Sequence, residues 1–393
     1  MQISCENIDL LLSANFSGSV YESMEHKLQA QAGLEKIWGK DMGRFATMQR
    51  KILPKAYKKI PTWYAHQCFF TPKSYEQSTA EAVAMFKSGL IKGRRLLSLT
   101  GGLGVDDWAF SQTFDSVVSL DTDDDLNCLV RINFEKLGIK NYTRLDTEAE
   151  TYLSENTEAF DCFYIDPDRR AADESKGLDA QLFSPNILDL LKEFPAIQNN
   201  LWIKLSPATD ITWISENIDK KIDLYIIEWQ GEVKEILCHI HGEMSGLLQV
   251  CVLPNFCYEK DTPIDKTKFP DEILFEPSAA LIKSHMMASE FGTALELDKL
   301  NDDFTLYKSH HILPHVLGKQ GIIISRGTEG FKQVKKEMLF FGISKASVTC
   351  RSYPLKPTDI MKKLKLKESA EYQLYFTSSK GKKMWFLIKK LKM

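Results

Sequence analysis

The sequence predicts an α/β fold built on a doubly wound parallel sheet, followed by smaller α+β parts. Three observations lead to this prediction. Residues 96–106 run from a short apolar stretch through a glycine-rich turn into a helical pattern. Further apolar stretches alternate with helical patterns as far as residue 166. The 393 residues are also too many for one hydrophobic core, so two or three domains are expected.

The first predicted strand ends in a turn that contains Gly101, Gly102 and Gly104. Because glycine has no Cβ, a ligand can approach the backbone N–H groups and the N-terminus of the helix that follows. The turn lacks the third glycine of the dinucleotide fingerprint and the lysine of a phosphate-binding loop. Taken alone, it is equally consistent with a plain strand–helix connection.

The next three predicted strands end at Asp121, Asp146 and Asp166. Aspartate is a common cap and turn residue, so one acidic strand end would mean little. Three of them after a glycine turn predict a nucleoside pocket at the carboxyl edge of the sheet. Asp121 is placed to accept both ribose hydroxyls, and Asp146 is placed at an adenine edge. The predicted strands cover residues 96–99, 116–121, 142–146, 160–166, 201–205, 223–229 and 232–241.

These motifs resemble those of the class I S-adenosylmethionine-dependent methyltransferases, whose first motif is an acidic residue followed by G-x-G-x-G. Ser98 takes the acidic place here, and Thr100 takes that of the first glycine. Asp106, Asp107 or Glu76 is then left to contact the methionine amino group. The resemblance implies a Rossmann-like seven-stranded sheet and S-adenosylmethionine as the cofactor. It implies that the cofactor-binding residues are Thr100, Gly101, Gly102, Gly104, Asp121 and Asp146.

The fourth motif of that family is often D-P-P-Y, and here it reads Asp166, Pro167, Asp168, Arg169. Asp166, Asp168 and Arg169 are the catalytic residues that the resemblance implies, with Asp166 orienting the nucleophile or accepting its proton. The aromatic residue that stacks the target base is missing, which disfavours an exocyclic amine as the target. Arg169 and Arg170 can instead bind a phosphate or a flipped base, or pair with nearby acids. The motif has no cysteine for covalent attack.

More narrowly, the chain is similar to the bacterial THUMP-like-domain methyltransferases. The motifs that carry this similarity are YEQST at 75–79, TGGLGVD at 100–106, IDPDRR at 165–170, KLSP at 204–207, FEPSAA at 275–280 and RSYP at 351–354. The resemblance implies methylation of RNA, either tRNA or rRNA. It implies four parts: a helical N-terminal region at 1–90, a class I methyltransferase domain at 91–255, a small ferredoxin-like α+β domain at 256–320 and a THUMP-like module at 321–393.

Charge is distributed very unevenly along the chain. Residues 321–393 hold 17 basic and 5 acidic side chains, a net of +12, whereas the rest of the chain has a net of −15. Residues 115–174 alone have a net of −10, which would repel a phosphate backbone. Because cationic patches supply most non-specific affinity for nucleic acid, RNA is expected to bind the basic module. The alternative is a solvated lysine-rich face. The lysines expected to contact RNA are Lys362, Lys363, Lys365, Lys380, Lys382 and Lys383.

The basic module is expected to be folded. Strand patterns occur at 321–325, 346–353, 372–377 and 383–388, and helical patterns occur at 331–341 and 357–364. This alternation predicts a small α+β module.

Other features exclude several protein classes. No apolar run approaches the roughly eighteen residues of a membrane span. Acidic residues, and no basic region, precede the first short apolar stretch, so no signal peptide is expected. The eight cysteines contain no Cys-x-x-Cys pair, which predicts reduced thiols in a cytoplasmic protein. His239 and His241 share one side of a predicted strand, and His310, His311 and His315 are also close in sequence. No third ligand has metal-site spacing to either group, so no metal site is expected.

Two other functions remain open. Ser98 and the altered fourth motif are compatible with a non-catalytic RNA-binding protein that has a degenerate cofactor pocket. A nicotinamide oxidoreductase is the second alternative. The predicted antiparallel hairpin at 223–241 argues against it, because such a hairpin is typical of the methyltransferase sheet and uncommon in nicotinamide dehydrogenases.

Overall fold

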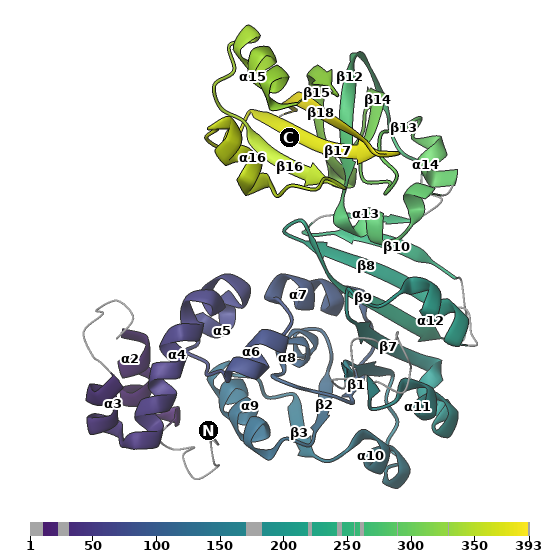
Figure 1. Cartoon of the computed structure of the whole chain (residues 1–393). Coiled ribbons are helices and arrows are strands. Elements are labelled where there is room, and N and C mark those ends of the chain that lie inside the picture. The colour runs from purple at the N-terminus through teal and green to yellow at the C-terminus, as the bar shows by residue number, and fades with distance from the viewer. Residues whose placement is uncertain are drawn as a thin grey trace. The chain divides into compact units, whose positions relative to one another are not determined.

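The structure is a computed structural model that describes residues 11–22, 31–169, 183–218, 222–241, 246–254, 256–259, 263–288, 290–328 and 330–391. The chain divides into two compact units (Figure 1). The first unit comprises residues 1–225 and 234–246, and the second comprises residues 226–233 and 247–393. The four-part division proposed from the sequence stays a prediction.

Six helices open the described part of the first unit and share a hydrophobic core with the helices of its sheet. Phe16, Phe45 and Phe69 form an aromatic cluster, with Phe45 and Phe69 centroids 5.6 Å apart. The side chain of Asn133 bonds both backbone groups of Phe69, at 2.8 Å each, and so ties these helices to the sheet layer. The helices are α2 (Ala14–Glu22), α3 (Gln31–Trp38), α4 (Lys40–Lys59), α5 (Pro61–Ala65), α6 (Pro72–Gln77) and α7 (Glu81–Leu90).

The larger sheet has the strand order β11-β10-β8-β9-β7-β4-β1-β2-β3. Neighbouring strands from β7 to β3 are parallel, and β9 runs antiparallel to β7. Its strands are β1 (Arg95–Ser98), β2 (Ser116–Asp121), β3 (Tyr142–Asp146), β4 (Cys162–Ile165), β7 (Asn200–Leu205), β8 (Asp223–Trp229), β9 (Glu232–His241), β10 (Leu248–Val252) and β11 (Phe256–Glu259). The predicted α/β fold is confirmed, including the terminal hairpin of β8 and β9. Two further strands, β10 and β11, extend the expected seven to nine.

Helices connect the parallel strands, as a doubly wound sheet requires. They are α8 (Val105–Ser111), α9 (Asp124–Lys136), α10 (Ala149–Glu155), α11 (Ile187–Glu193), α12 (Ile211–Asn217) and the 3₁₀-helix η3 (Pro195–Asn199). The side chain of Asp123 caps the N-terminus of α9 by accepting from the backbone N–H of Leu126. A small ribbon of β5 (Asp168–Arg169) and β6 (Phe183–Ser184) follows β4. The central strand β4 is buried throughout, which explains its continuous apolar sequence.

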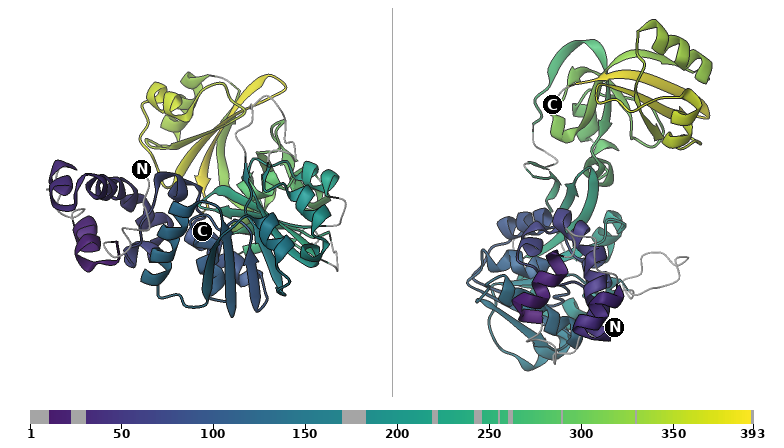
Figure 2. Two further views of the ribbon diagram at one scale, coloured as in Figure 1. Left: turned by 90° about the horizontal axis from the view of Figure 1, so that it is seen from below. Right: turned by 90° about the vertical axis from the view of Figure 1, so that its left-hand side faces the viewer.

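The second unit contains a seven-stranded sheet of order β13-β14-β12-β15-β18-β17-β16. The C-terminal strands of this sheet are drawn in yellow in Figure 2. Strand β12 pairs with both β14 and β15, so residues from 256–320 and from 321–393 share this sheet. The α+β pattern predicted for the basic segment is confirmed. The strands are β12 (Thr267–Pro277), β13 (Asp298–Lys299), β14 (Tyr307–Ile312), β15 (Gly318–Gly327), β16 (Ser347–Arg351), β17 (Tyr372–Ser379) and β18 (Lys382–Lys390). The helices are α13 (Ala279–Lys283), α14 (Glu290–Ala294), α15 (Phe331–Phe340), α16 (Pro357–Leu364), η4 (Met286–Ala288) and η5 (His315–Leu317).

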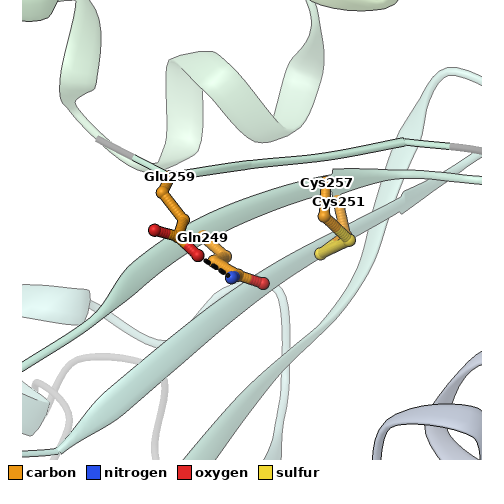
Figure 3. The surroundings of a disulfide bond; sticks show 4 residues. All are labelled: Gln249, Cys251, Cys257 and Glu259. Atoms are coloured by element: carbon orange, nitrogen blue, oxygen red, sulfur yellow. Dashed lines mark hydrogen bonds between the residues drawn. A yellow bond between two sulfur atoms is a disulfide. The ribbon is translucent and has the colours of Figure 1, made fainter. Parts of the chain in front are cut away.

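Cys251 and Cys257 form a disulfide between β10 and β11 (Figure 3). The two residues are directly opposite in the antiparallel register, with their Cα atoms 4.1 Å apart. The expectation of reduced thiols is therefore wrong for this pair. A tight hairpin brings together cysteines six positions apart, which a search for Cys-x-x-Cys does not register. Cys128 is also disulfide-bonded, whereas four of the cysteines that the structure describes are free: Cys68, Cys162, Cys238 and Cys350.

Among the described residues, no helix is long and apolar enough to cross a membrane.

Candidate active site

A cavity of about 1120 Å³ lies at the carboxyl ends of the parallel strands in the first unit. Residues that follow β1, β2, β3, β4 and β7 all line it. The chain order of the sheet changes direction between β1 and β4, and doubly wound sheets bind ligands at such a point. The cavity is therefore where the sequence predicts a pocket.

The glycine turn after β1 forms one wall of this cavity. The backbone N–H of Gly102 donates to Oδ2 of Asp121 at 2.8 Å, which joins the turn to the end of β2. Gly104 has a φ of 84°, and a Cβ there would lie 2.9 Å from the ring of Phe134. Glycine at position 104 thus serves both the backbone conformation and the close packing of α9.

Arg144 on β3 holds the turn from behind and is a site residue that sequence reasoning missed. Its side chain is fully buried, and its Nη2 donates to the carbonyl of Gly102 at 2.8 Å. It also pairs with Asp121 at 3.2 Å and with Asp107 at 3.7 Å. Burial alone would lower the pKa of Arg144, but Tyr142 and these two carboxylates hold that pKa above its usual value. The guanidinium therefore fixes both the turn and the acid at the end of β2.

The structure places the two predicted nucleoside-binding acids differently. Asp121 lines the cavity, and its Oδ1 also accepts from the backbone N–H of Asp123 at 3.1 Å. Asp146 is directly opposite Asp121 in the β2–β3 register but does not line the cavity. Its carboxylate is bound by Arg131, at 2.7 and 2.8 Å, and by Asn127. The adenine contact assigned to Asp146 stays a prediction.

A buried charge cluster lies beside the cavity. The ammonium of Lys87 is fully buried and lies 2.9 Å from Asp106 Oδ2, 2.9 Å from Glu235 Oε1 and 2.8 Å from the hydroxyl of Tyr164. Burial raises the pKa of Asp106, but Lys87 and Lys204 outweigh it and hold that pKa below its usual value. Burial holds the pKa of Glu235 above its usual value. A buried lysine in the last turn of α7 gave no sequence signal, because its partners come from distant segments.

Asp106 stands out among the three carboxylates that the sequence left open for the methionine amino group. Its Oδ2 accepts three donors, whereas its buried Oδ1 accepts no hydrogen bond from any residue that the structure describes. Asp107 accepts a 2.6 Å bond from Ser119, and burial raises the pKa of Asp107 to about 6. Glu76 is exposed and does not line the cavity.

Asp166 lies at the cavity after β4 and is tied to the first motif. Its backbone N–H donates to the hydroxyl of Thr100 at 2.7 Å, so the threonine in the first glycine's place joins two motifs. Its Oδ2 lies 2.5 Å from the ammonium of Lys204. Burial would lower the pKa of Lys204, but the carboxylates of Asp166, Asp106 and Glu235 hold that pKa above its usual value.

The rest of the fourth motif is less completely described. Asp168 is exposed, lines the cavity, and accepts from the side-chain amide of Gln77 at 3.4 Å. Arg169 pairs with Phe183 in the β5–β6 ribbon, but its side chain lies outside the described part of the structure, as does the whole of Arg170.

The six lysines expected to contact RNA are all exposed in the second unit. Within the described part of that unit, no acid lies in ion-pair distance of any of them. Three consecutive apolar residues at the end of α15 are exposed as well: Leu339 by 82%, Phe340 by 80% and Phe341 by 43%. Exposed apolar runs of this kind are unusual away from binding surfaces.

Asp223, His239 and His241 form the one group of metal-ligating type found among the described residues, with one ligand atom from each within 4.8 Å of the others. Asp223 begins β8, and the two histidines are on β9. Asp223 was not grouped with the two histidines from the sequence because it lies on the neighbouring strand.

Comparison with known proteins adds two findings. Residues 328–390 match a family model described as THUMP domain-like. The fold matches the crystal structure of a candidate methyltransferase from Porphyromonas gingivalis W83, with a TM-score of 0.77 and 21% identity, over 97% of this chain and 99% of that one. Comparison with curated proteins found no match.

Two other solved structures match part of the chain. One is a candidate methyltransferase from Streptococcus mutans in complex with SAH, at 20% identity and a TM-score of 0.30, covering 41% of this chain and 95% of that one. The other is an rRNA methylase from Streptococcus thermophilus, at 12% identity and a TM-score of 0.31, covering 42% and 95%.

These findings confirm the resemblance to THUMP-like methyltransferases that the sequence motifs indicate, both in the C-terminal domain and in the fold. The chain has a methyltransferase-like fold and carries a THUMP-like domain at residues 328–390.

Proposed function

We propose that this chain is an S-adenosylmethionine-dependent methyltransferase that acts on RNA. The observation that carries the proposal is the cavity at the switch point of the sheet, where the glycine turn, Asp121 and Asp166 come together. The antiparallel hairpin of β8 and β9 supports a methyltransferase sheet over a nicotinamide enzyme.

The residues around the cavity fit S-adenosylmethionine. Asp106 Oδ1, buried and without a hydrogen-bond partner in the described structure, is suited to accept from the methionine ammonium. The charges around it support this assignment, since three carboxylates (Asp106, Glu235 and Asp166) lie beside two ammonium groups (Lys87 and Lys204). A cationic group of the cofactor would balance the excess negative charge.

The ribose hydroxyls are assigned to Asp121. A carboxylate has about four acceptor positions. Asp121 uses some of them for Gly102, Asp123 and Arg144, and these contacts hold the side chain in place at the cavity wall. Such pre-positioning lowers the entropy that the ligand contact must offset.

When bound, S-adenosylmethionine supplies an electrophilic methyl group that reacts by in-line displacement, so the protein chiefly positions the nucleophile and excludes water. Asp166, whose side chain is 38% exposed, is accessible from the cavity for this role. Lys204 holds one carboxylate oxygen of Asp166, which leaves the other to accept from an N–H or O–H of the nucleophile. Asp166 thus orients the nucleophile and is positioned to take the proton it loses.

RNA capture is assigned to the second unit. The THUMP domain-like match, the net charge of +12 over residues 321–393 and the six exposed lysines all support it. The first unit lines its cavity with many acids and gains nothing from approaching phosphates unaided.

Calorimetry of the full chain with S-adenosylhomocysteine and with NAD tests the cofactor assignment. Binding of S-adenosylhomocysteine alone is expected, and binding of NAD alone would overturn the proposal. Failure to bind either cofactor, together with retained RNA binding, would favour the non-catalytic RNA-binding protein. Mass spectrometry of nucleosides from a deletion strain then identifies the modified RNA, whose missing methyl group should return when the purified protein and S-adenosylmethionine are added.

A further inference from the structure

Asp223, His239 and His241 form a cluster that the methyltransferase proposal does not use. His239 and His241 are two positions apart on β9, so they share one side of that strand. Asp223 lies on β8, the next strand of the sheet. None of the three lines the active-site cavity, so the cluster is a separate feature of the first unit.

The hydrogen bonds around His239 fix which ring nitrogen has a lone pair. Asn200 donates its side-chain N–H to the carbonyl of Asp161 at 2.8 Å, so its Oδ1 is the acceptor. That oxygen also accepts from the indole N–H of Trp202, which can only donate, at 3.0 Å. His239 Nε2, 2.9 Å from the same oxygen, must therefore donate too. In the neutral ring, the lone pair is then on Nδ1.

The rings are also held by packing. His239 stacks on Trp202 with ring centroids 3.7 Å apart and an angle of 9° between the planes. His241 stacks on His239 at 4.4 Å, and its Nε2 lies 2.9 Å from Asp223 Oδ2. The bond from His239 to Asn200 is of the kind that holds metal-binding histidines, because a partner on the second nitrogen fixes the tautomer and the ring orientation.

We infer that Asp223, His239 and His241 bind a divalent transition-metal ion such as Zn²⁺. Two imidazole nitrogens and one carboxylate oxygen form a donor set that suits such an ion, with at least one position left for water or another ligand. Zn–N distances of about 2.0–2.1 Å place the ligand atoms of a tetrahedral site about 3.3 Å apart. The three ligand atoms, now within 4.8 Å of one another, must therefore move closer, and the two stacked rings must turn out of parallel to direct their lone pairs at one ion. The side chain of His241 is 21% exposed, which gives an ion access from solvent.

The competing interpretation is a hydrogen-bonded cluster that only stabilises the β8–β9 hairpin. The two interpretations differ in one measurable respect. A metal site binds one ion tightly and depends on all three ligands, whereas a structural cluster gains nothing from the ion. This inference does not depend on the proposed methyltransferase activity.

The test uses the full chain, stripped with EDTA, dialysed and titrated with ZnCl₂ by calorimetry and with CoCl₂ by visible absorption. One equivalent of Zn²⁺ and the visible bands of four-coordinate Co²⁺ are expected. His239→Ala, His241→Ala and Asp223→Asn should each weaken Zn²⁺ binding at least about 100-fold. Asn200→Ala should weaken it about 10–100-fold, because Asn200 acts through His239.

His310→Ala, at an exposed histidine on β14 in the second unit, is the matched control and should leave the titration unchanged. Thermal melting in EDTA shows whether each variant folds, and His241→Gln replaces any variant that does not. The inference is overturned if the wild type takes up no stoichiometric Zn²⁺, or if folded variants of all three ligands bind it as the wild type does.

Discussion

Replacing Gly101 with alanine should damage both the stability of the first unit and its cofactor site. A Cβ at position 101 would lie 1.7 Å from Nη1 of Arg144 and 2.2 Å from the hydroxyl of Ser119. Arg144 is fully buried and has no free space to retreat into, so the turn or the guanidinium must shift. Overpacking of this kind typically costs about 1–3 kcal/mol. For a unit of this size, that corresponds to a fall in Tm of about 2–12 °C.

The same shift should also weaken cofactor binding, because Arg144 bonds the carbonyl of Gly102 and the carboxylate of Asp121. Calorimetry with S-adenosylhomocysteine and thermal melting of the full chain measure the two effects. Gly89→Ala is the matched control: Gly89 is in α7, and a Cβ there meets nothing within 4 Å. This control should gain about 0.5–1 kcal/mol and bind normally. If Gly101→Ala melts and binds like the wild type, Arg144 does not support the turn.

Three further predictions follow from the proposed function and from the buried charges. Asp166→Asn should abolish methyl transfer to the native RNA while S-adenosylhomocysteine affinity stays within a few-fold, and normal turnover would refute its catalytic role. Changing the three lysines within 362–365 to glutamine should weaken RNA binding and lower its salt slope by about 0.7–0.9 for each phosphate that is no longer neutralised. An unchanged slope would show that these lysines are only solvated. Asp107→Asn should flatten the pH dependence of Tm: because the pKa of Asp107 is raised to about 6, the wild type loses stability as pH rises from about 4 through 6, by about 1–3 kcal/mol. If Tm changes equally between pH 5 and pH 7.5 in the wild type and the variant, Asp107 does not cause the loss of stability.

The sequence predicts the parallel strands and their polar ends because both signals are local. An apolar run, a glycine turn and an acid at the strand end each occupy a few neighbouring residues, as at Gly101–Gly104 and Asp121. The hairpin of β8 and β9 is equally local, since a Gln230-Gly231 turn joins its strands. Strand β11 was missed because the stretch after residue 254 has few apolar residues, whereas the apolar run of β10 before it was not assigned to a strand.

The groups that organise the site could not be predicted in this way. A charged residue such as Lys87 or Arg144 would ordinarily be placed at the surface. Each is buried here because its partners arrive from distant segments: Lys87 from a helix meets Glu235 from β9, and Arg144 from β3 meets Asp107 from α8. Such pairs exist only once the sheet is assembled. Asp223 differs from these groups, because the predicted hairpin of β8 and β9 already places it near His239, and only a search for ligands that are close in sequence leaves it out.

The Asp106→Asn variant tests whether the first motif still binds the cofactor or is degenerate. The motif lacks an acid at Ser98, and a degenerate pocket would leave Asp106 with a purely structural role. The substitution removes one of three carboxylates beside two ammonium groups and still leaves Lys87 paired with Glu235 and Lys204 paired with Asp166. The free energy of unfolding should therefore change little. If Asp106 were instead an essential buried partner of Lys87, its loss would cost about 3–5 kcal/mol.

Cofactor binding should respond much more strongly to Asp106→Asn. A hydrogen bond from an ammonium to a carboxylate contributes about 1.5–3 kcal/mol, so affinity for S-adenosylhomocysteine should fall about 10–150-fold. Calorimetry and thermal melting on the same preparation give both values. A variant that binds normally but melts far below the wild type would make Asp106 a structural partner of Lys87. A variant that melts normally but loses the cofactor would show that an acid in the first turn of α8 has taken over the role of the missing strand-end carboxylate.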